Sequence, residues 1–291
     1  MLAFITELLA APAVGTALLI GSLVAVTSGV VGVFVVVRGQ SFAGHALGDI
    51  GTTGAAAAYL GGVPALYGFI GVGVLGGLAI ERLGERARER DIATGIVLSF
   101  LLGVGSLLLY FMTQRISATG GPVAILFGSI FTVDPAVTLP VALFSLLALL
   151  LLGFLYRPLV FASVHPQAAR ARGVPLQGVG ILFMLALAIA VEESALVAGA
   201  LLSTALLIGP AAAAVRWTRH IGQAAAVAAL LGLVTVWLGI ALAYQSYFWS
   251  GAHRGWPVSF FIVMLVLLEY LLARIGPAKR ASRSDAPREA A

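Results

Sequence analysis

Long apolar segments alternate with short polar loops along the whole chain. A membrane-spanning helix needs roughly 20 predominantly apolar residues, and nine segments approach or exceed that length. They lie near residues 13–37, 44–62, 64–81, 92–112, 136–156, 174–191, 195–215, 220–247 and 257–274. The second, third and sixth segments are short, so we expect a broken or tilted helix there. The pattern predicts an all-α, polytopic transmembrane bundle over residues 1–275. The polar residues 276–291 are expected to form a disordered cytoplasmic tail.

The composition agrees with a membrane protein. Of the 291 residues, 60% are hydrophobic and 10% are charged, and the mean hydropathy is +1.06, whereas about a quarter of the residues in a soluble domain are charged. The chain has no cysteine, which excludes disulfides, thiolate metal sites and thiol catalysis. The formal charge of +5 does not indicate nucleic-acid binding, because the basic residues lie in short clusters between apolar segments. The start "MLAFITELLAAP" lacks the positive charge of a signal peptide and predicts a short interfacial helix that ends near Pro12.

The distribution of basic residues predicts an orientation. With nine spans and the N-terminus outside, 15 of the 17 Lys and Arg residues fall on the cytoplasmic side, and only Arg115 and Arg254 fall outside. Cytoplasmic loops of membrane proteins carry such an excess, and a missed span would destroy the alternation. We therefore expect a multi-pass protein of the plasma (inner) membrane with a cytoplasmic C-terminus.

His45 and Asp49 are one helical turn apart in the second predicted span. Positions i and i+4 share a face of a helix, and ionisable side chains inside a membrane are costly and often functional. Imidazole and carboxylate together suit a borderline divalent cation. Two ligands are too few for a tight site, so a twofold dimer would supply four. The residues alone also allow a local hydrogen-bonded pair.

Glu192 and Glu193 lie at the expected outer end of the sixth span. They are either a solvated helix end or an acidic mouth that attracts cations. The loop "TQRISATGGPVAILFGSIFTVDP" is too apolar for an exposed loop and too interrupted to span, which predicts a re-entrant or interfacial piece covered by protein. The small-residue segments "GTTGAAAAYLGG" and "GPAAAAV" predict close helix packing.

The loop "YRPLVFASVHPQAARARGVPLQG" contains a short amphipathic stretch between Pro166 and Gly173, which are start and stop signals for a helix. A helix this short is marginal alone, so either a partner surface holds it or the segment is an ordinary interfacial loop. The glycines of "GVGVLGG" lack the lysine of a phosphate-binding loop, and no nucleophile accompanies His45 and Asp49. We therefore expect no enzymatic activity.

Five segments together resemble the permease subunits of the manganese/zinc/iron ABC transporter family. They are "RGQSFAGHALGDIG", "ERDIATGIVLSF", "AILFGSI", "HPQAARARGVP" and "ALVAGALLSTALLIGPAAAA", and the last two are the most specific. The resemblance extends from about residue 15 to residue 275. It implies a permease that forms the pathway as a homodimer, with cytoplasmic ATPase subunits that use ATP and an extracytoplasmic metal-binding protein. A divalent metal ion would be the substrate, with no permanently bound cofactor.

The resemblance also assigns residues. His45 and Asp49 would form a transient metal site, and the segment at about 163–174 would be a coupling helix that docks on the ATPase. Its residues would be His165, Pro166, Ala168, Ala169, Arg170, Arg172 and Gly173.

The chain departs from the family in three places. The family order is aspartate then histidine, whereas here His45 precedes Asp49. A family glutamine is replaced in the "EES" segment at 192–194, and His165 stands where aspartate is usual. With these differences, the sequence does not determine which metal is carried or which residues gate the pathway.

Two other functions fit the sequence less well. In an ABC permease for a siderophore or vitamin, the His45–Asp49 pair would have no direct role in binding the substrate. A proton-coupled secondary transporter would use Asp49 as the proton-carrying group and would need no ATPase.

Overall fold

The structure is a computed structural model, and it describes residues 12–84, 87–115, 120–128, 130–249 and 255–275. All regular elements in these ranges are helical. The α-helices are α2 (Pro12–Val37), α3 (Ser41–Leu60), α4 (Ala65–Leu83), α5 (Ala87–Arg115), α6 (Gly120–Phe127), α7 (Thr138–Val164), α8 (Pro166–Ala171), α9 (Leu176–Ala198), α10 (Ser203–Trp217), α11 (Ile221–Ser246) and α12 (Val258–Ile275). Three short 3₁₀ turns, η1 (Ile130–Thr132), η2 (Pro135–Val137) and η3 (Ala200–Leu202), lie between them. The predicted interfacial helix before Pro12 and the predicted tail 276–291 lie outside the described residues.

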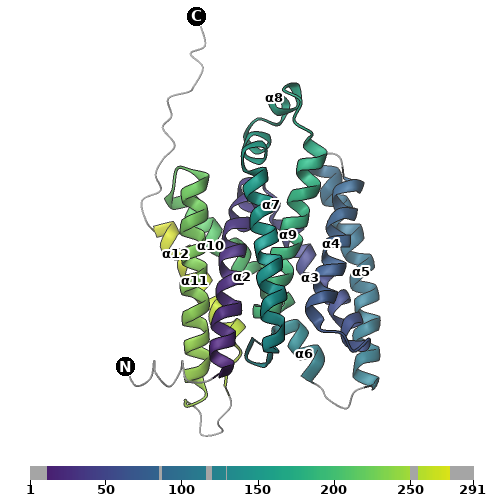
Figure 1. Ribbon diagram of the computed structural model, residues 1–291, viewed down its shortest axis with the longest axis vertical. Coiled ribbons are helices and arrows are strands. Elements are labelled where there is room, and N and C mark those ends of the chain that lie inside the picture. The colour runs from purple at the N-terminus through teal and green to yellow at the C-terminus, as the bar shows by residue number, and fades with distance from the viewer. Residues whose placement is uncertain (1–11, 85–86, 116–119, 129, 250–254, 276–291) are drawn as a thin grey trace, which may run out of the picture.

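Each of the nine predicted spans corresponds to one helix (Figure 1), but the seventh, predicted to begin at residue 195, begins only after the break at Gly199, as η3 and α10. Eight of these helices are long and apolar enough to cross a membrane, α10 only together with the 3₁₀ turn η3 before it, and α3 is the exception among the described residues. It has sufficient length, but His45, Asp49, two threonines and four glycines lower its hydropathy. A broken or tilted helix was predicted at the second, third and sixth spans, and none of the three is broken, because α3, α4 and α9 run without interruption over 20, 19 and 23 residues.

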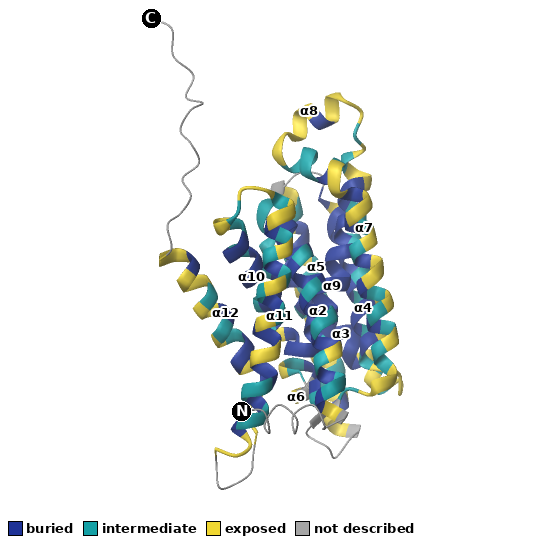
Figure 2. Ribbon diagram, turned by 60° about the vertical axis from the view of Figure 1, so that its left-hand side comes forward, coloured by how far each residue is buried: buried dark blue, intermediate teal, exposed yellow. Residues whose placement is uncertain are grey.

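The helices α9 and α2 form the centre of the bundle. They are the most buried of the candidate spans, whereas α5 and α7 are the least buried, as the colouring in Figure 2 shows for the centre of the bundle. The largest buried side chains include Phe34, Leu47, Phe183 and Leu187. Large exposed apolar side chains, such as Phe100 and Phe154, suit a helix that faces lipid.

Glycines allow several very close helix contacts, and Gly54 lies in one of the small-residue segments for which close packing was predicted. A Cβ atom on Gly54 of α3 would overlap the backbone of Gly68 in α4, and the reverse also holds. A Cβ on Gly29 of α2 would lie 2.7 Å from the backbone nitrogen of Ala229 in α11. Backbones can approach this closely only where side chains are absent.

The loop after α5 forms a short interrupted element, as predicted. The helix α6 contacts α3, α5, α9 and η3, so protein covers part of its surface. It ends at Gly128 (φ 76°), which packs against Gly199 (φ 84°) at the break between α9 and η3. A Cβ on Gly128 would lie 2.6 Å from the Gly199 nitrogen. Both positions therefore require glycine, for conformation and for space.

Candidate metal-translocation site

The helix α3 presents one glycine face and one polar face. Gly44, Gly48 and Gly51 lie against α9 and α10, where added Cβ atoms would meet Leu207, Ser203 and Glu192 respectively. These glycines let α3 sit close to both helices. His45 and Asp49 each follow one of these glycines in sequence, so they project from the neighbouring face of α3.

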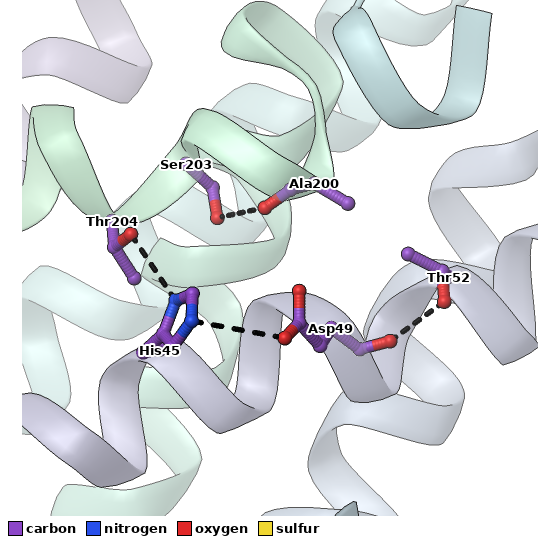
Figure 3. Close-up of polar contacts among 6 residues, drawn as sticks. All are labelled: His45, Asp49, Thr52, Ala200, Ser203 and Thr204. Carbon is purple, nitrogen blue, oxygen red and sulfur yellow. Dashed lines mark hydrogen bonds and ion pairs between the residues drawn. The ribbon is translucent and has the colours of Figure 1, made fainter. Parts of the chain in front are cut away.

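His45 and Asp49 lie side by side on this face (Figure 3). The distance from His45 Nε2 to Asp49 Oδ2 is 3.8 Å, which is too long for a hydrogen bond but within reach of an ion pair. Thr204 of α10 places its Oγ1 3.5 Å from the other imidazole nitrogen, Nδ1. The geometry therefore differs from the closed, hydrogen-bonded pair that the sequence also allowed, and both side chains keep unused bonding capacity.

The pair also lies at the surface of the chain. The His45 side chain is 49% exposed and the Asp49 side chain 18% exposed. Asp49 is eight residues into a 20-residue helix, about 12 Å from its start. Polar side chains at such a depth are expected to face protein or water rather than lipid. Within the described residues, no group of three or more His, Cys, Asp or Glu side chains could hold a metal ion.

The structure corrects the prediction for Glu192 and Glu193. The sequence placed them at an exposed helix end or an acidic mouth, but both are fully buried. The reason is that α9 continues to Ala198, more than one turn beyond them. They therefore do not form an exposed acidic surface in this structure. The uninterrupted apolar residues "ALVA" that follow, ended by Gly199, were the signal in the sequence for the longer helix.

The buried "EES" segment connects α9 to four other helices. Glu192 fills a slot formed by Gly51 of α3 and Gly73 of α4. Glu193 accepts a hydrogen bond of 2.9 Å from Ser145 of α7. Ser194 lies 3.0 Å from Ser28 of α2 through their hydroxyl oxygens. The sequence pattern did not predict this polar centre.

The short helix predicted between Pro166 and Gly173 is present as α8, at one end of the bundle (Figure 1). Pro166 occupies its first turn, and Gly173 ends it with φ 78°. The Val174 backbone N–H donates to Ala169 O at 3.0 Å, which closes the helix end. Ala169 is buried, whereas the other α8 residues and the flanking residues that the resemblance assigned to docking are exposed. They are His165, Pro166, Ala168, Arg170, Arg172 and Gly173.

Comparisons with known proteins agree with this architecture. The model of the ABC 3 transport family matches residues 11–271. The manganese transport system membrane protein MntC of Halalkalibacterium halodurans is 32% identical over 242 residues, which cover 81% of this chain and 80% of that protein. The manganese import system permease protein ScaB of Streptococcus gordonii is 27% identical over 233 residues, which cover 79% and 81% of the two chains.

A solved structure shares the fold. PsaBC from Streptococcus pneumoniae, in complex with Fab, superposes with a TM-score of 0.74 at 25% identity and covers 94% of this chain and 95% of that chain. The family model matches most of the sequence, and the resemblance drawn from the five segments is confirmed. The chain is a multi-pass membrane permease that belongs to the ABC 3 transport family of metal transporters.

Proposed function

We propose that this chain is the membrane subunit of an ATP-driven importer for a divalent metal ion, manganese, zinc or iron, and that two copies form the pathway. The observation that carries the proposal is the polar face of α3. A half-exposed imidazole and a carboxylate whose oxygens can bind further partners lie on the surface of the single chain, within a helix of the bundle. A second copy facing this surface would cover the polar side chains and supply two further ligands.

The ligand chemistry suits the proposed substrate. Imidazole nitrogen and carboxylate oxygen together bind borderline divalent cations. A site of four such ligands from two copies would hold the ion without a rigid, closed coordination shell, so that the ion could leave again. The metal is the substrate here, and this chain would bind it only in passage. Thr204, which contacts His45, would orient the imidazole.

ATP hydrolysis would belong to a partner subunit. The exposed helix α8 offers a docking surface for a cytoplasmic ATPase, and an extracytoplasmic metal-binding protein would deliver the ion to the other side. Under this proposal α8 and the C-terminus would lie in the cytoplasm, and the 15 basic residues expected on that side support it. The chain itself would catalyse no covalent reaction.

The site is tested by uptake of radioactive manganese in vesicles that contain the permease, its ATPase and its delivery protein. His45→Ala and Asp49→Ala should each lower uptake at least about tenfold, the scale of losses from disturbed metal sites, while the complex still assembles. Ser106→Ala, an exposed polar position on α5, is the control and should transport normally. Undiminished uptake by the double alanine variant would remove the pair from the mechanism.

The exchanged order of the two ligands gives a second test. The double variant His45→Asp/Asp49→His restores the family order and keeps both ligand types on the same helical face. It should retain more uptake than either single alanine variant, and its preference among manganese, zinc and iron should shift. Uptake as low as in the alanine variants would show that position, and not only ligand type, is required.

The vesicle assay also separates the competing classes. Uptake that requires ATP and the partner ATPase supports the proposal. Uptake by the chain alone, driven by a proton gradient, would instead identify a secondary transporter. ATPase stimulation by a metal chelate but not by the free ion would identify a siderophore permease.

A further inference from the structure

A polar cavity lies between α8 and the body of the bundle. Its volume is about 520 Å³, within the range of small-molecule sites. The ends of α2, α4 and α7 and the starts of α5 and α9 surround it together with α8. It is separate from His45 and Asp49, neither of which lines it. The lining residues that carry the argument are Arg38, Gln40, Glu81, Arg90, Arg170 and Gln177.

The lining is strongly basic. Three arginines and one glutamate among the lining residues give a formal charge of +2. Glu81 is buried, and Arg90 donates to it at 3.0 Å. This single ion pair accounts for one of the three positive charges. Arg38 lies near enough to Glu81 to interact with its charge but forms no ion pair with it, and Arg170 forms no ion pair with a carboxylate among the described residues. A cavity of this charge favours an anion and disfavours a cation such as the transported metal.

Arg38 is fixed in place by its neighbours. Its Nε donates to Gln40 Oε1 at 3.2 Å, and its guanidinium carbon lies 4.9 Å from the centre of the Phe183 ring. Burial and then the positive charge of Arg90 lower the pKa of the Arg38 guanidinium, and Glu81 opposes this effect. An anion beside Arg38 would therefore relieve the repulsion between the two arginines.

Donors that can bind an anion are still free. The Arg90 Nε atom is buried and has no hydrogen-bond partner among the described residues. Arg170 projects from α8 and is exposed. An arginine offers five N–H donors in a planar fork that matches the oxygen atoms of a phosphate.

We propose that this cavity binds a phosphate-bearing anion through Arg38, Arg90 and Arg170, and so connects α8 to α2 and α5. Two sources share this chemistry, the headgroup of an anionic phospholipid and free inorganic phosphate. The position favours the lipid, because basic pockets between transmembrane helices at the cytoplasmic face bind such headgroups. The inference goes beyond the proposed function and shares with it only the cytoplasmic position of α8.

The test uses the full-length chain in an uncharged detergent. Binding of inorganic phosphate and of phosphatidylglycerol is measured by thermal shift and native mass spectrometry, with chloride and phosphatidylcholine as matched reference ligands. Arg170→Gln removes one exposed, positively charged hydrogen-bond donor from the cavity. It should weaken the binding of both probes at least about tenfold, the value of one charge-assisted hydrogen bond. Arg172→Gln is the control, because Arg172 is two residues away, lies over the Phe161 ring and does not line the cavity.

Arg38→Gln is a second variant, and its melting temperature without ligand shows whether it folds. Specific binding of both probes, weakened by Arg170→Gln but not by Arg172→Gln, supports recognition of the phosphate group itself. Binding of phosphatidylglycerol alone identifies the lipid as the source, and binding of phosphate alone identifies the free anion.

Several results would overturn the proposal. They are the absence of binding by both probes, equal losses in the Arg172→Gln control, and weaker association of Arg170→Gln with the ATPase without any loss of anion binding. The last result would assign the arginines to a protein contact. Because the assay contains neither metal nor ATPase when anion binding is measured, its failure would leave the proposed metal transport untouched.

Discussion

The residues next to Glu192 in the sequence favour an exposed position for its side chain, whereas the packing of the helices buries it. Its neighbours Glu193 and Ser194 are polar, which favours a solvated helix end. In the structure it is fully buried, and both of its carboxylate oxygens lack hydrogen-bond partners among the described residues. It occupies space that only the missing side chains of Gly51 and Gly73 make available.

The fit around Glu192 can be tested with two glycines one turn apart on α4. A Cβ on Gly73 would lie 2.6 Å from Glu192 Cγ, whereas a Cβ on Gly77 would have no heavy atom closer than 3.5 Å. Gly73→Ala should therefore lower the unfolding free energy by about 1–3 kcal/mol, the usual effect of overpacking. Gly77→Ala should have no such effect, because alanine is the better helix former. Thermal unfolding of the purified chain measures both.

A further variant checks the cause of the loss. Replacing Glu192 by alanine frees the slot, so Glu192→Ala should restore part of the stability lost in Gly73→Ala when the two are combined. Equal melting temperatures for Gly73→Ala and Gly77→Ala would contradict the packing argument, as would purely additive losses in the double variant.

At the scale of elements, α3 and α8 differ in how well their sequences define them. The helix α8 has a proline at its start and a left-handed glycine at its end, so its limits were readable in advance. The helix α3 was predicted as a span from its apolar residues, but it carries a polar face and four glycines, and its contacts with α4, α5 and α9 show where it packs in the bundle.

The proposed docking role of α8 predicts a selective defect. Replacing residues 168–172 by a Gly/Ser segment removes the helix while leaving the spans intact. ATP hydrolysis by the assembled complex should then no longer be stimulated by the loaded delivery protein, and metal uptake should fall at least about tenfold. Because α8 is mostly exposed, the permease should still fold. Normal copurification with the ATPase and normal stimulated hydrolysis would exclude the role.

At the scale of the whole molecule, the proposed dimer predicts which surfaces meet. The chain contains no cysteine, so a single introduced thiol reports on one position. Phe42 shares the α3 face with His45 and Asp49 and is 46% exposed. Under mild oxidation in membranes, Phe42→Cys should form disulfide-linked dimers. Phe154→Cys, on α7 and 83% exposed, should not form them, because α7 would face lipid. The reverse pattern would place the contact between copies elsewhere.

The sequence alone determined the helical class, the nine long helices, α8 and the family. The helices depend on local properties, namely the length of apolar segments and the residues that start and end a helix, and the family was indicated by the resemblance of five sequence segments. The His45–Asp49 pair was also visible, because an i, i+4 spacing needs no tertiary information.

Only the tertiary structure decided how the polar residues are used. The burial of Glu192 and Glu193 depends on glycines and a serine from other helices. The contact between His45 and Thr204 joins residues far apart in the chain. The same is true of the cavity, which brings together Arg38, Arg90 and Arg170. The physical reason is that hydropathy measures whether a segment prefers lipid to water, whereas the environment of a polar side chain inside the bundle depends on which helices pack beside it.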